Sequence, residues 1–175
     1  MNPPSGFDRV IEHFSKHGWS CSWNRKDSIV RAGSKGLNIR FRLQVQVNEA
    51  DDLVVVWATL PIVVAGERRT EAAALCAYLS SGMRMGRFEM DPVTGDIRFQ
   101  ASSGYAPGQL SDSIIEKLIG VTAVMLDEHF PAFVEVICGK AVPAEAAQKI
   151  RGQICRGLHP SRREVVEDGA RLEQN

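Results

Sequence analysis

The sequence lacks an excess of either charge. Its 175 residues include 21 lysines and arginines and 21 aspartates and glutamates, so the formal net charge is zero. A chain without net charge has no overall field to attract nucleic acid or an anionic membrane surface. We therefore expect no nucleic-acid partner and no membrane partner.

Segments for export or membrane insertion are missing as well. The first residues show no basic region followed by an apolar run, which argues against a secretory signal. The longest uncharged apolar run, Leu53–Ala65, is too short for a transmembrane helix and contains Pro61. We expect a cytoplasmic protein.

Cysteine is scarce and scattered. The four cysteines form no C-x-x-C pair and lie at Cys21, Cys76, Cys138 and Cys155. Without an export signal, this usage indicates reduced thiols. Cys76 and Cys138 stand in apolar stretches, where we expect buried and unreactive thiols.

The composition is that of an ordinary globular protein, with 44% hydrophobic and 24% charged residues. A chain of this length can bury a core without disulfides or a structural metal. From Gly157 onward the sequence is charged and poor in large apolar side chains. We expect a single α+β domain over residues 1–156 and a flexible tail over residues 157–175.

The clearest local pattern is a β-hairpin at Met83–Ser102. Apolar and polar side chains alternate on both sides of the segment 91–95, which sends one apolar row inward from each strand. Asp91 can begin a type I turn, Pro92 fixes φ at the next position, and Gly95 can adopt the left-handed conformation that completes a bulged loop.

Other strands precede this hairpin. Leu37–Val47 alternates apolar and polar residues, as in an antiparallel strand with one solvated face, and shorter strands are expected over 19–23 and 28–32. Leu53–Val64 is apolar on both faces, so we expect either cover on both sides or contact with a second subunit. Pro61 predicts an edge or a bend near its end.

Helices are predicted between and after the strands. The first begins after Ser5 and ends at Gly18, and the second spans residues 66–82 with Thr70 as a possible cap. The third follows Ser111 and ends or kinks at Pro131, and a fourth covers residues 144–151 after Pro143. Antiparallel strands without crossover helices predict an α+β fold, with an antiparallel β-sheet packed with helices on one face.

Titratable residues form no convincing catalytic or metal site. His13 and His17 are four residues apart on a helix, a spacing that can ligate one metal ion, and Asp8 or Glu12 could supply an oxygen. No third strong ligand is predicted nearby, so we interpret the histidines as a surface pair and assign no metal.

Asp127, Glu128 and His129 are adjacent in the sequence, but adjacent helical side chains point about 100° apart and do not converge. His129 falls on the apolar stripe, which favours a core or helix-end position.

Two features suggest a binding surface. Arg40 and Arg42 lie on the polar side of their strand, and with the arginines at 84, 87 and 98 they could bind an acidic peptide or a phosphate group. The favoured alternative is that these arginines decorate an exposed face and pair with Glu89 or Asp96. In the apolar strand, Val55 and Trp57, or Val54 and Val56, could form a patch that drives association.

The segment Gly86–Phe99 resembles the signature of the YbjN-type family, to which regulation of bacterial sensory transduction is ascribed. That signature runs Gly-x-Phe-Glu-x-Asp, a turn, and Gly-x-aliphatic-x-aromatic. Similar flanks are Leu110–Asp112, Phe130-Pro131, and Gly139 with the segment 143–146, so the resemblance covers most of residues 5–150. Ser80-Ser81 departs from the family, whose members tend to carry Asn there.

The resemblance implies a fold like that of type III secretion chaperones, often dimeric, and a regulatory or chaperone-like role through protein contacts. The neutral charge departs from the acidic balance of many such chaperones. The resemblance to the YbjN-type family implies no catalytic residues. Because no nucleophile–base pair or ligand triad can be assembled, we expect no enzyme, no cofactor and no catalytic site.

Our leading hypothesis is a homodimeric, non-enzymatic module of a bacterial cytoplasm. It would bind an unidentified protein or extended peptide through an exposed sheet edge or the apolar strand face. The predicted interaction residues are Val55, Trp57, Arg40 and Arg42. The alternative is a small-molecule or metal-responsive sensor domain with a pocket between helix and sheet.

Overall fold

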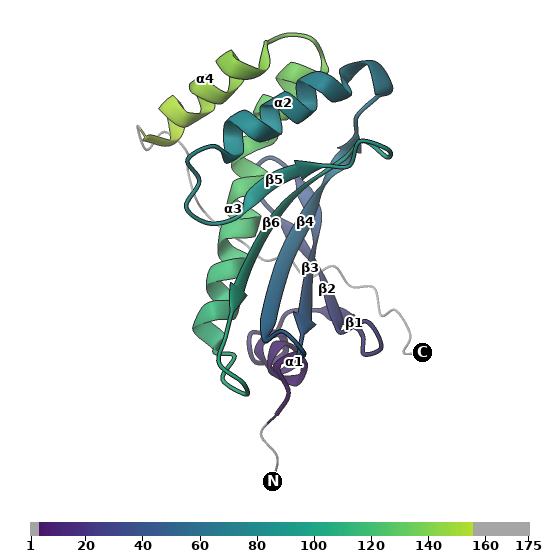
Figure 1. The fold of residues 1–175 in the computed structure, drawn as a ribbon, viewed down its shortest axis with the longest axis vertical. Coiled ribbons are helices and arrows are strands. Elements are labelled where there is room, and N and C mark those ends of the chain that lie inside the picture. Colours follow the sequence, from purple (N-terminus) through teal and green to yellow (C-terminus); the bar gives the residue numbers. More distant parts are fainter. Residues whose placement is uncertain (1–3, 156–175) are drawn as a thin grey trace.

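The computed structural model describes residues 4–155. Figure 1 shows the elements, which in chain order are α1 (Gly6–Lys16), β1 (Cys21–Asn24), β2 (Ile29–Lys35), β3 (Arg40–Asn48), β4 (Leu53–Val63), the 3-10 turn η1 (Gly66–Arg68), α2 (Arg69–Ser80), β5 (Arg87–Met90), β6 (Asp96–Gly104), α3 (Asp112–Ile137) and α4 (Pro143–Cys155). The segment 157–175, predicted to be a flexible tail, lies outside the described residues.

The strands form one antiparallel sheet in the order β1-β2-β3-β4-β6-β5. Consecutive strands are neighbours except that β5 pairs outside β6, so the hairpin joins the sheet through β6. The pairing of β4 with β6 shifts register between Thr59 and Val63. Pro61 lies inside this shift, because a proline cannot donate to the ladder. Because β3 pairs with β4 only as far as Thr59, Pro61 also lies at an edge of the sheet, as predicted.

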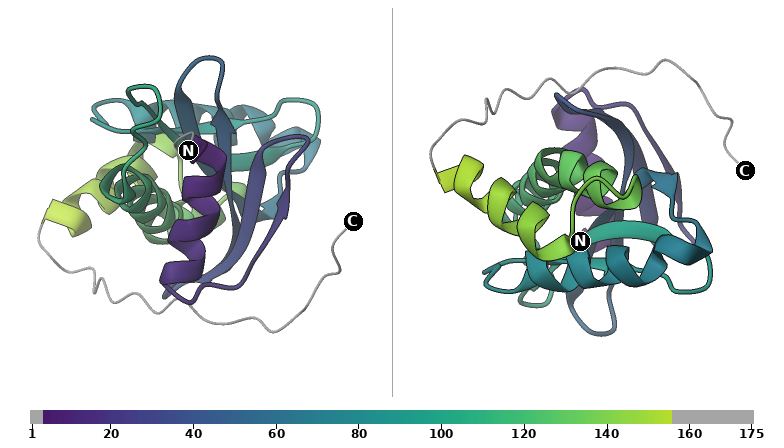
Figure 2. Two further views of the ribbon diagram at one scale, coloured as in Figure 1. Left: turned by 90° about the horizontal axis from the view of Figure 1, so that it is seen from below. Right: turned by 90° about the horizontal axis from the view of Figure 1, so that it is seen from above.

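The alternation of side chains assigns one face of the sheet to the core. The buried row consists of Phe41, Leu43, Val45 and Val47 on β3 and of Val54, Val56, Ala58 and Leu60 on β4. Helix α3 lies over β4 and β6, and α1 lies over β2 and β3. Figure 2 shows the sheet curling around these helices. The predicted α+β fold with helices packed on an antiparallel sheet is confirmed.

The predicted hairpin is present with the expected turn. Asp91 Oδ1 accepts hydrogen bonds from the backbone N–H groups of Val93 at 2.7 Å and Thr94 at 3.1 Å, and Gly95 has a φ of 82°. The hydrogen bonds from Thr94 and Val93 lower the pKa of Asp91. Because these bonds favour the ionised carboxylate, the turn closes best with Asp91 charged.

The outer edge of β5 is covered by the end of α2. Ser80 Oγ accepts a hydrogen bond from the backbone N–H of Phe88 at 2.8 Å and lies 3.3 Å from the carbonyl oxygen of the same residue. One hydroxyl can donate and accept at once, so it satisfies both outward backbone groups of Phe88. These two hydrogen bonds explain why a small hydroxyl residue stands at the end of α2.

A buried carboxylate joins α3 to the loop between β2 and β3. Asp127 is 7% exposed and accepts hydrogen bonds from the backbone N–H groups of Leu37, Asn38 and Ile39 at 2.9, 2.9 and 3.0 Å. A Cβ on Gly36 would lie 2.1 Å from Asp127 Oδ1, so only glycine allows the loop to approach this closely. Asp127 is thus a structural residue.

Helix α3 continues through Pro131 to Ile137, which excludes an end at Pro131; the other predicted outcome, a kink, stays a prediction. A proline removes the hydrogen bond to the carbonyl four residues earlier, which here belongs to Asp127. The side-chain amide of Asn38 donates to that carbonyl oxygen at 3.0 Å. The same loop therefore satisfies both the carboxylate of Asp127 and the backbone group that Pro131 leaves free.

Two smaller predictions also need correction. Cys138 is exposed at the C-terminal end of α3, whereas Cys76 is buried as expected. Burial raises the pKa of the Cys76 thiol to about 12, so it stays protonated. Thr70 does not cap α2, because the chain enters the helix through η1 and the capping residue is Arg68.

Candidate functional site

The face of the sheet opposite the helices carries all four residues predicted to form an interaction surface. Val55 and Trp57 on β4 alternate with buried residues and point to this face, and both are half-buried. Arg40 and Arg42 on β3 also alternate with buried residues and are exposed. Among residues 4–155 the helices pack on the other side of the sheet, and we call this surface the uncovered face.

Trp57 lies near the middle of the uncovered face, on β4 between β3 and β6. Its direct cross-strand neighbours are Gln44 on β3 and Gln100 on β6. Arg42 pairs with Thr59, which makes Arg42 a diagonal neighbour of Trp57. Diagonal pairs of long side chains on one face of a sheet are within contact range. The strand register therefore makes Trp57 and Arg42 diagonal neighbours, with Val55 on the next cross-strand row, whereas Arg40 lies beyond the segment of β3 that pairs with β4.

The arginines of the uncovered face differ in their partners. Arg87 and Arg98 both bind Glu89, at 2.5 and 2.8 Å, as predicted, while Asp96 accepts a hydrogen bond from Thr94 instead. Burial raises the pKa of Glu89, but the hydrogen bonds from both arginines outweigh it and the pKa is lowered.

Among the residues that the structure describes, no carboxylate lies within ion-pair distance of Arg40 or Arg42. Their charges are therefore open to an acidic ligand. The prediction that the arginines pair with neighbouring carboxylates holds for β5 and β6 and fails for β3, where Thr59 and Arg98 lie between Arg42 and Glu89 in the cross-strand row.

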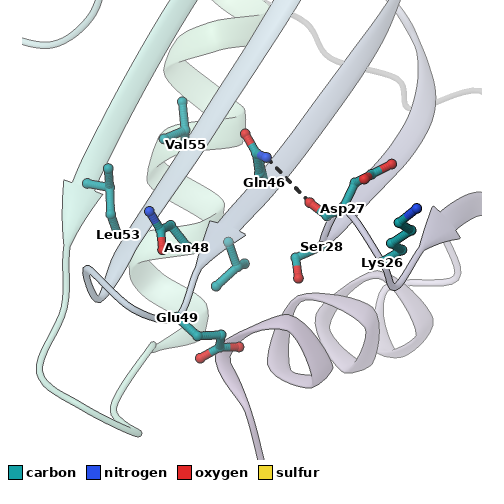
Figure 3. A pocket seen from close by; sticks show the side chains of 9 residues that line it. Lys26, Asp27, Ser28, Gln46, Asn48, Glu49, Leu53 and Val55 are labelled. Carbon is teal, nitrogen blue, oxygen red and sulfur yellow. Dashed lines mark hydrogen bonds between the residues drawn. The ribbon is translucent and has the colours of Figure 1, made fainter.

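A shallow depression of about 440 Å³ continues the uncovered face toward the β3–β4 turn. Figure 3 shows Val55 and Leu53 on one side and Lys26 and Asp27 on the other, with Gln46 donating a hydrogen bond to the backbone carbonyl of Asp27 at 3.4 Å. Apolar and polar groups are mixed here. The depression can hold a side chain of a bound segment next to Val55.

Residues that surround the predicted set complete the surface. Gln44, Gln46, Gln100 and Ser102 line the uncovered face beside Trp57 and Val55. The alternation within each strand identifies them as polar, outward residues, but the cross-strand register that makes them neighbours is not visible in the sequence. Glutamine and arginine side chains next to apolar groups bind by hydrogen bonds, charge and apolar contact.

The histidines have different surroundings from those expected. His129 is 3% exposed, and its Nδ1 lies 2.8 Å from the carbonyl oxygen of Met125, which confirms a core position. His13 is fully buried rather than on the surface, because α1 packs it against α3 and the ring of Trp19. His17 keeps a side-chain exposure of 33%.

Comparison with protein-family models identifies a family that spans most of the described residues. The model of the YbjN family, described as "putative bacterial sensory transduction regulator", matches residues 7–135, which is more than half of the chain. The chain belongs to the YbjN family. The resemblance inferred from the hairpin sequence is confirmed.

The fold is also shared with a solved member of the YbjN family. The crystal structure of YbjN from E. coli, described as a putative transcription regulator, superposes with a TM-score of 0.52 at 11% sequence identity, covering 81% of this chain and 91% of that one. A search of curated proteins found no match. Within the described part of the chain, even the 26-residue α3 lacks a stretch apolar enough to cross a bilayer.

The residues that carry the resemblance to the YbjN family serve the fold. Phe88 is 4% exposed, and its ring contacts the rings of Phe99, Phe133 and His129 at centroid distances of 5.0, 5.2 and 5.3 Å. Asp91 and Gly95 form the turn. The signature residues therefore explain the hairpin and its packing, and none of these three is among the residues predicted to form an interaction surface.

Proposed function

We propose that this member of the YbjN family is a non-enzymatic regulatory module of the bacterial cytoplasm. In this proposal it binds an extended, acidic segment of another protein on the uncovered face of its sheet. The description of the family as a regulator supports the regulatory role. The choice of surface and of ligand chemistry depends on the structure of the uncovered face.

The observation that carries the proposal is the combination of Trp57 with unpaired arginines. Trp57 is half-buried and presents a large, rigid apolar ring beside Arg42, and Arg40 lies farther along the same strand. Tryptophan and arginine are the residues most enriched among those that dominate binding energy at protein interfaces. Within the described residues neither arginine has a carboxylate partner, so an acidic ligand gains charge pairing without breaking an existing ion pair.

The charges favour an acidic segment over a second copy of the chain. In a symmetric dimer the same surface meets itself, so two copies joined through this face would bring arginine-rich surfaces together. Like charges opposed across an interface are unfavourable, whereas opposite charges also speed association. The homodimer expected from the sequence stays a prediction. The uncovered face is poorly suited to self-association, because its arginines would face those of the second copy.

The two edge strands of the sheet provide fewer groups for binding a peptide than the uncovered face does. Addition of a peptide strand requires free backbone groups at an edge strand. At β5 the outward groups of Phe88 are already bonded to Ser80. At the other edge, β1 has four residues, which gives a short ladder. Side-chain contacts on the uncovered face are therefore the better basis for recognition.

The expected affinity is moderate. Covering about 200 Å² of apolar surface around Trp57 and Val55 contributes about 5 kcal/mol at about 25 cal/mol per Å². Charge-assisted hydrogen bonds to Arg40 and Arg42 add about 1.5–3 kcal/mol each, and the ordering of a flexible segment offsets several kcal/mol of the total. The balance of about 3–9 kcal/mol corresponds to a dissociation constant between the millimolar and the sub-micromolar range, as suits a reversible regulatory contact.

The test is a selection from a library of random peptides displayed on phage, followed by calorimetry with the enriched sequences. Wild type should enrich peptides that contain several Asp or Glu residues and an apolar residue. The double variant Arg40→Glu/Arg42→Glu should lose these peptides and enrich basic ones. The matched control Lys117→Glu/Lys140→Glu changes the net charge equally at exposed residues of α3 and of the loop that follows it, and should select as wild type does.

Two results would contradict the proposal. One is a wild-type selection without acidic bias, and the other is an acidic bias that the Arg40→Glu/Arg42→Glu variant retains. Light scattering on wild type and on Trp57→Asp separates the remaining alternative. A dimer that becomes a folded monomer in Trp57→Asp would assign the uncovered face to self-association instead.

A further inference from the structure

A second cluster of titratable side chains lies where α1 meets the start of α3. It is formed by helices, whereas the uncovered face is formed by strands. His13 and His17 lie one helical turn apart at the end of α1, and Asp112 and Glu116 lie one turn apart at the start of α3. His13 Nδ1 is 3.3 Å from Asp112 Oδ1, and His17 Nε2 is 3.4 Å from Glu116 Oε1. The two imidazole rings have centroids 4.3 Å apart.

The hydrogen bonds of both histidines fix which nitrogen carries the proton. His17 Nδ1 lies 2.8 Å from the carbonyl oxygen of His13, which can only accept, so the proton of His17 is on Nδ1. His13 Nδ1 faces the carboxylate of Asp112 in the same way. In His13, Nε2 then carries a lone pair, whereas Nε2 of His17 faces the carboxylate of Glu116.

The lone pair of His13 has no partner within the described residues. Its Nε2 is buried and makes no hydrogen bond, in a side chain with 0% exposure. A buried polar atom without a partner is costly and uncommon, so it calls for an explanation. Burial lowers the pKa of His13, although the hydrogen bond to Asp112 opposes it. An imidazole nitrogen with a free lone pair is a common metal ligand.

The distances fit a metal ion with little rearrangement. One ring nitrogen of His13, one of His17 and a carboxylate oxygen of Glu116 all lie within 4.8 Å of one another. Tetrahedral zinc with ligand distances of about 2.0–2.1 Å separates its ligand atoms by about 3.4 Å. Glu116 has a side-chain exposure of 56% and His17 of 33%, so both can move the remaining distance without disturbing the core.

The surrounding groups match those of known metal sites. A metal-bound histidine almost always donates its second ring N–H to a carboxylate or a backbone carbonyl. Here Asp112 and the carbonyl of His13 fill these two roles. Lys16 is the nearby cation. Its Nζ binds the other carboxylate oxygen of Asp112 at 3.0 Å, so the charges of Lys16 and Asp112 neutralise each other.

We propose that His13, His17 and Glu116 bind a divalent transition-metal ion, with zinc as the best candidate and a water molecule in the fourth position. Two imidazoles and one carboxylate suit zinc, whereas magnesium and calcium require oxygen ligands. Asp112 acts as a positioning residue that holds His13. The ion joins the end of α1 to the start of α3, so occupancy stabilises their packing.

The sequence shows half of this site. The spacing of His13 and His17 indicates a two-histidine ligand pair, but the suggested oxygen donors on the same helix are engaged elsewhere. Asp8 binds Arg25 at 2.9 Å, and Glu12 lies 3.8 Å from Arg9. The third ligand comes from a helix 99 residues later in the chain, which helix periodicity cannot reveal.

The experiment is calorimetric titration of the tag-free, chelator-treated protein with ZnCl₂. Wild type should bind one ion per chain. His17→Ala and Glu116→Gln should each weaken zinc binding more than about 100-fold, and Asp112→Asn by about 10–100-fold, as is typical of an outer carboxylate. The matched control Glu12→Gln removes an exposed carboxylate of the same helix and should bind as wild type does.

Two further readouts separate binding at this site from adventitious binding. Co²⁺ should produce the visible absorption of a tetrahedral site in wild type and not in His17→Ala. Trp19 lies 5.8 and 5.6 Å from the rings of His13 and His17, so Cu²⁺ should quench its fluorescence, and Trp19→Phe should lose the quenched component. The proposal is overturned if wild type shows no saturable zinc binding, or if His17→Ala and Glu116→Gln bind as tightly as wild type.

Discussion

The contact between Asp127 and the β2–β3 loop gives a sharp prediction for stability. Asp127→Ala removes the acceptor of three backbone N–H groups. The bond from Ile39 is fully buried, while those from Leu37 and Asn38 are part-buried, so water can partly replace them. An unsatisfied buried N–H costs about 1–3 kcal/mol. We assign about 2 kcal/mol to Ile39 and about 0.5–1 kcal/mol to each of the others, which gives a total loss of about 3–4 kcal/mol.

Urea unfolding followed by circular dichroism measures this loss. The midpoint should fall while the slope stays constant, because the same surface is exposed on unfolding. Asp127→Asn should cost less, about 2 kcal/mol, because its carbonyl oxygen still accepts while its amide opposes the remaining donors. Glu145→Ala is the control, since Glu145 is exposed in the first turn of α4 and should change stability by less than about 0.5 kcal/mol.

A substitution at Gly36 tests the same contact from the side of the loop. Gly36→Ala places a methyl group where the Asp127 carboxylate lies, so it should displace the carboxylate and lose the same hydrogen bonds. In the Asp127→Ala background the alanine has room, and the two changes should cost about 2 kcal/mol less together than the sum of the single effects. A loss below about 1 kcal/mol for Asp127→Ala, or strict additivity with Gly36→Ala, would refute the reasoning.

Three further predictions concern the hairpin and the helix start. Ser80→Ala leaves both outward backbone groups of Phe88 without their partner and should lower the free energy of unfolding in urea by about 1–2 kcal/mol. Ser111→Ala removes the side-chain cap of α3 and should cost about 1 kcal/mol in the same assay, with Ser111→Asp close to wild type. The lowered pKa of Glu89 stabilises the fold above the ordinary pKa of 4.5, and this stabilisation is lost as the pH falls through the lower folded-state value, so Glu89→Gln should flatten the loss of stability below about pH 4.5. A Glu89→Gln curve parallel to wild type would contradict the role of the arginine pairs.

Much of the fold follows from local patterns. The alternation in β3 and in the β5–β6 hairpin predicts strands with one buried row, and Ser5 and Ser111 predict two helix starts that the structure confirms. These signals are readable because they repeat every two or every three to four residues. The polar character of β3 also predicts which face stays uncovered.

The contacts between distant segments do not follow from such patterns. Leu37 and Asp127 are 90 residues apart, and His13 and Asp112 are 99 apart. The helix rule at Pro131 fails because Asn38, from another element, replaces the missing hydrogen bond. On the uncovered face, alternation identifies outward residues, but only the strand register places Trp57 beside Arg42.

In the proposed function an acidic segment binds across Trp57 on the uncovered face. The most direct measurement is ¹H–¹⁵N NMR of the labelled protein titrated with an acidic peptide from the library selection. We predict saturating shifts of the Trp57 indole N–H and of the backbone amides of β3, β4 and β6, with α1, α2 and α4 unchanged. Shifts confined to β1 or to the helices, with the Trp57 indole unaffected, would contradict the account.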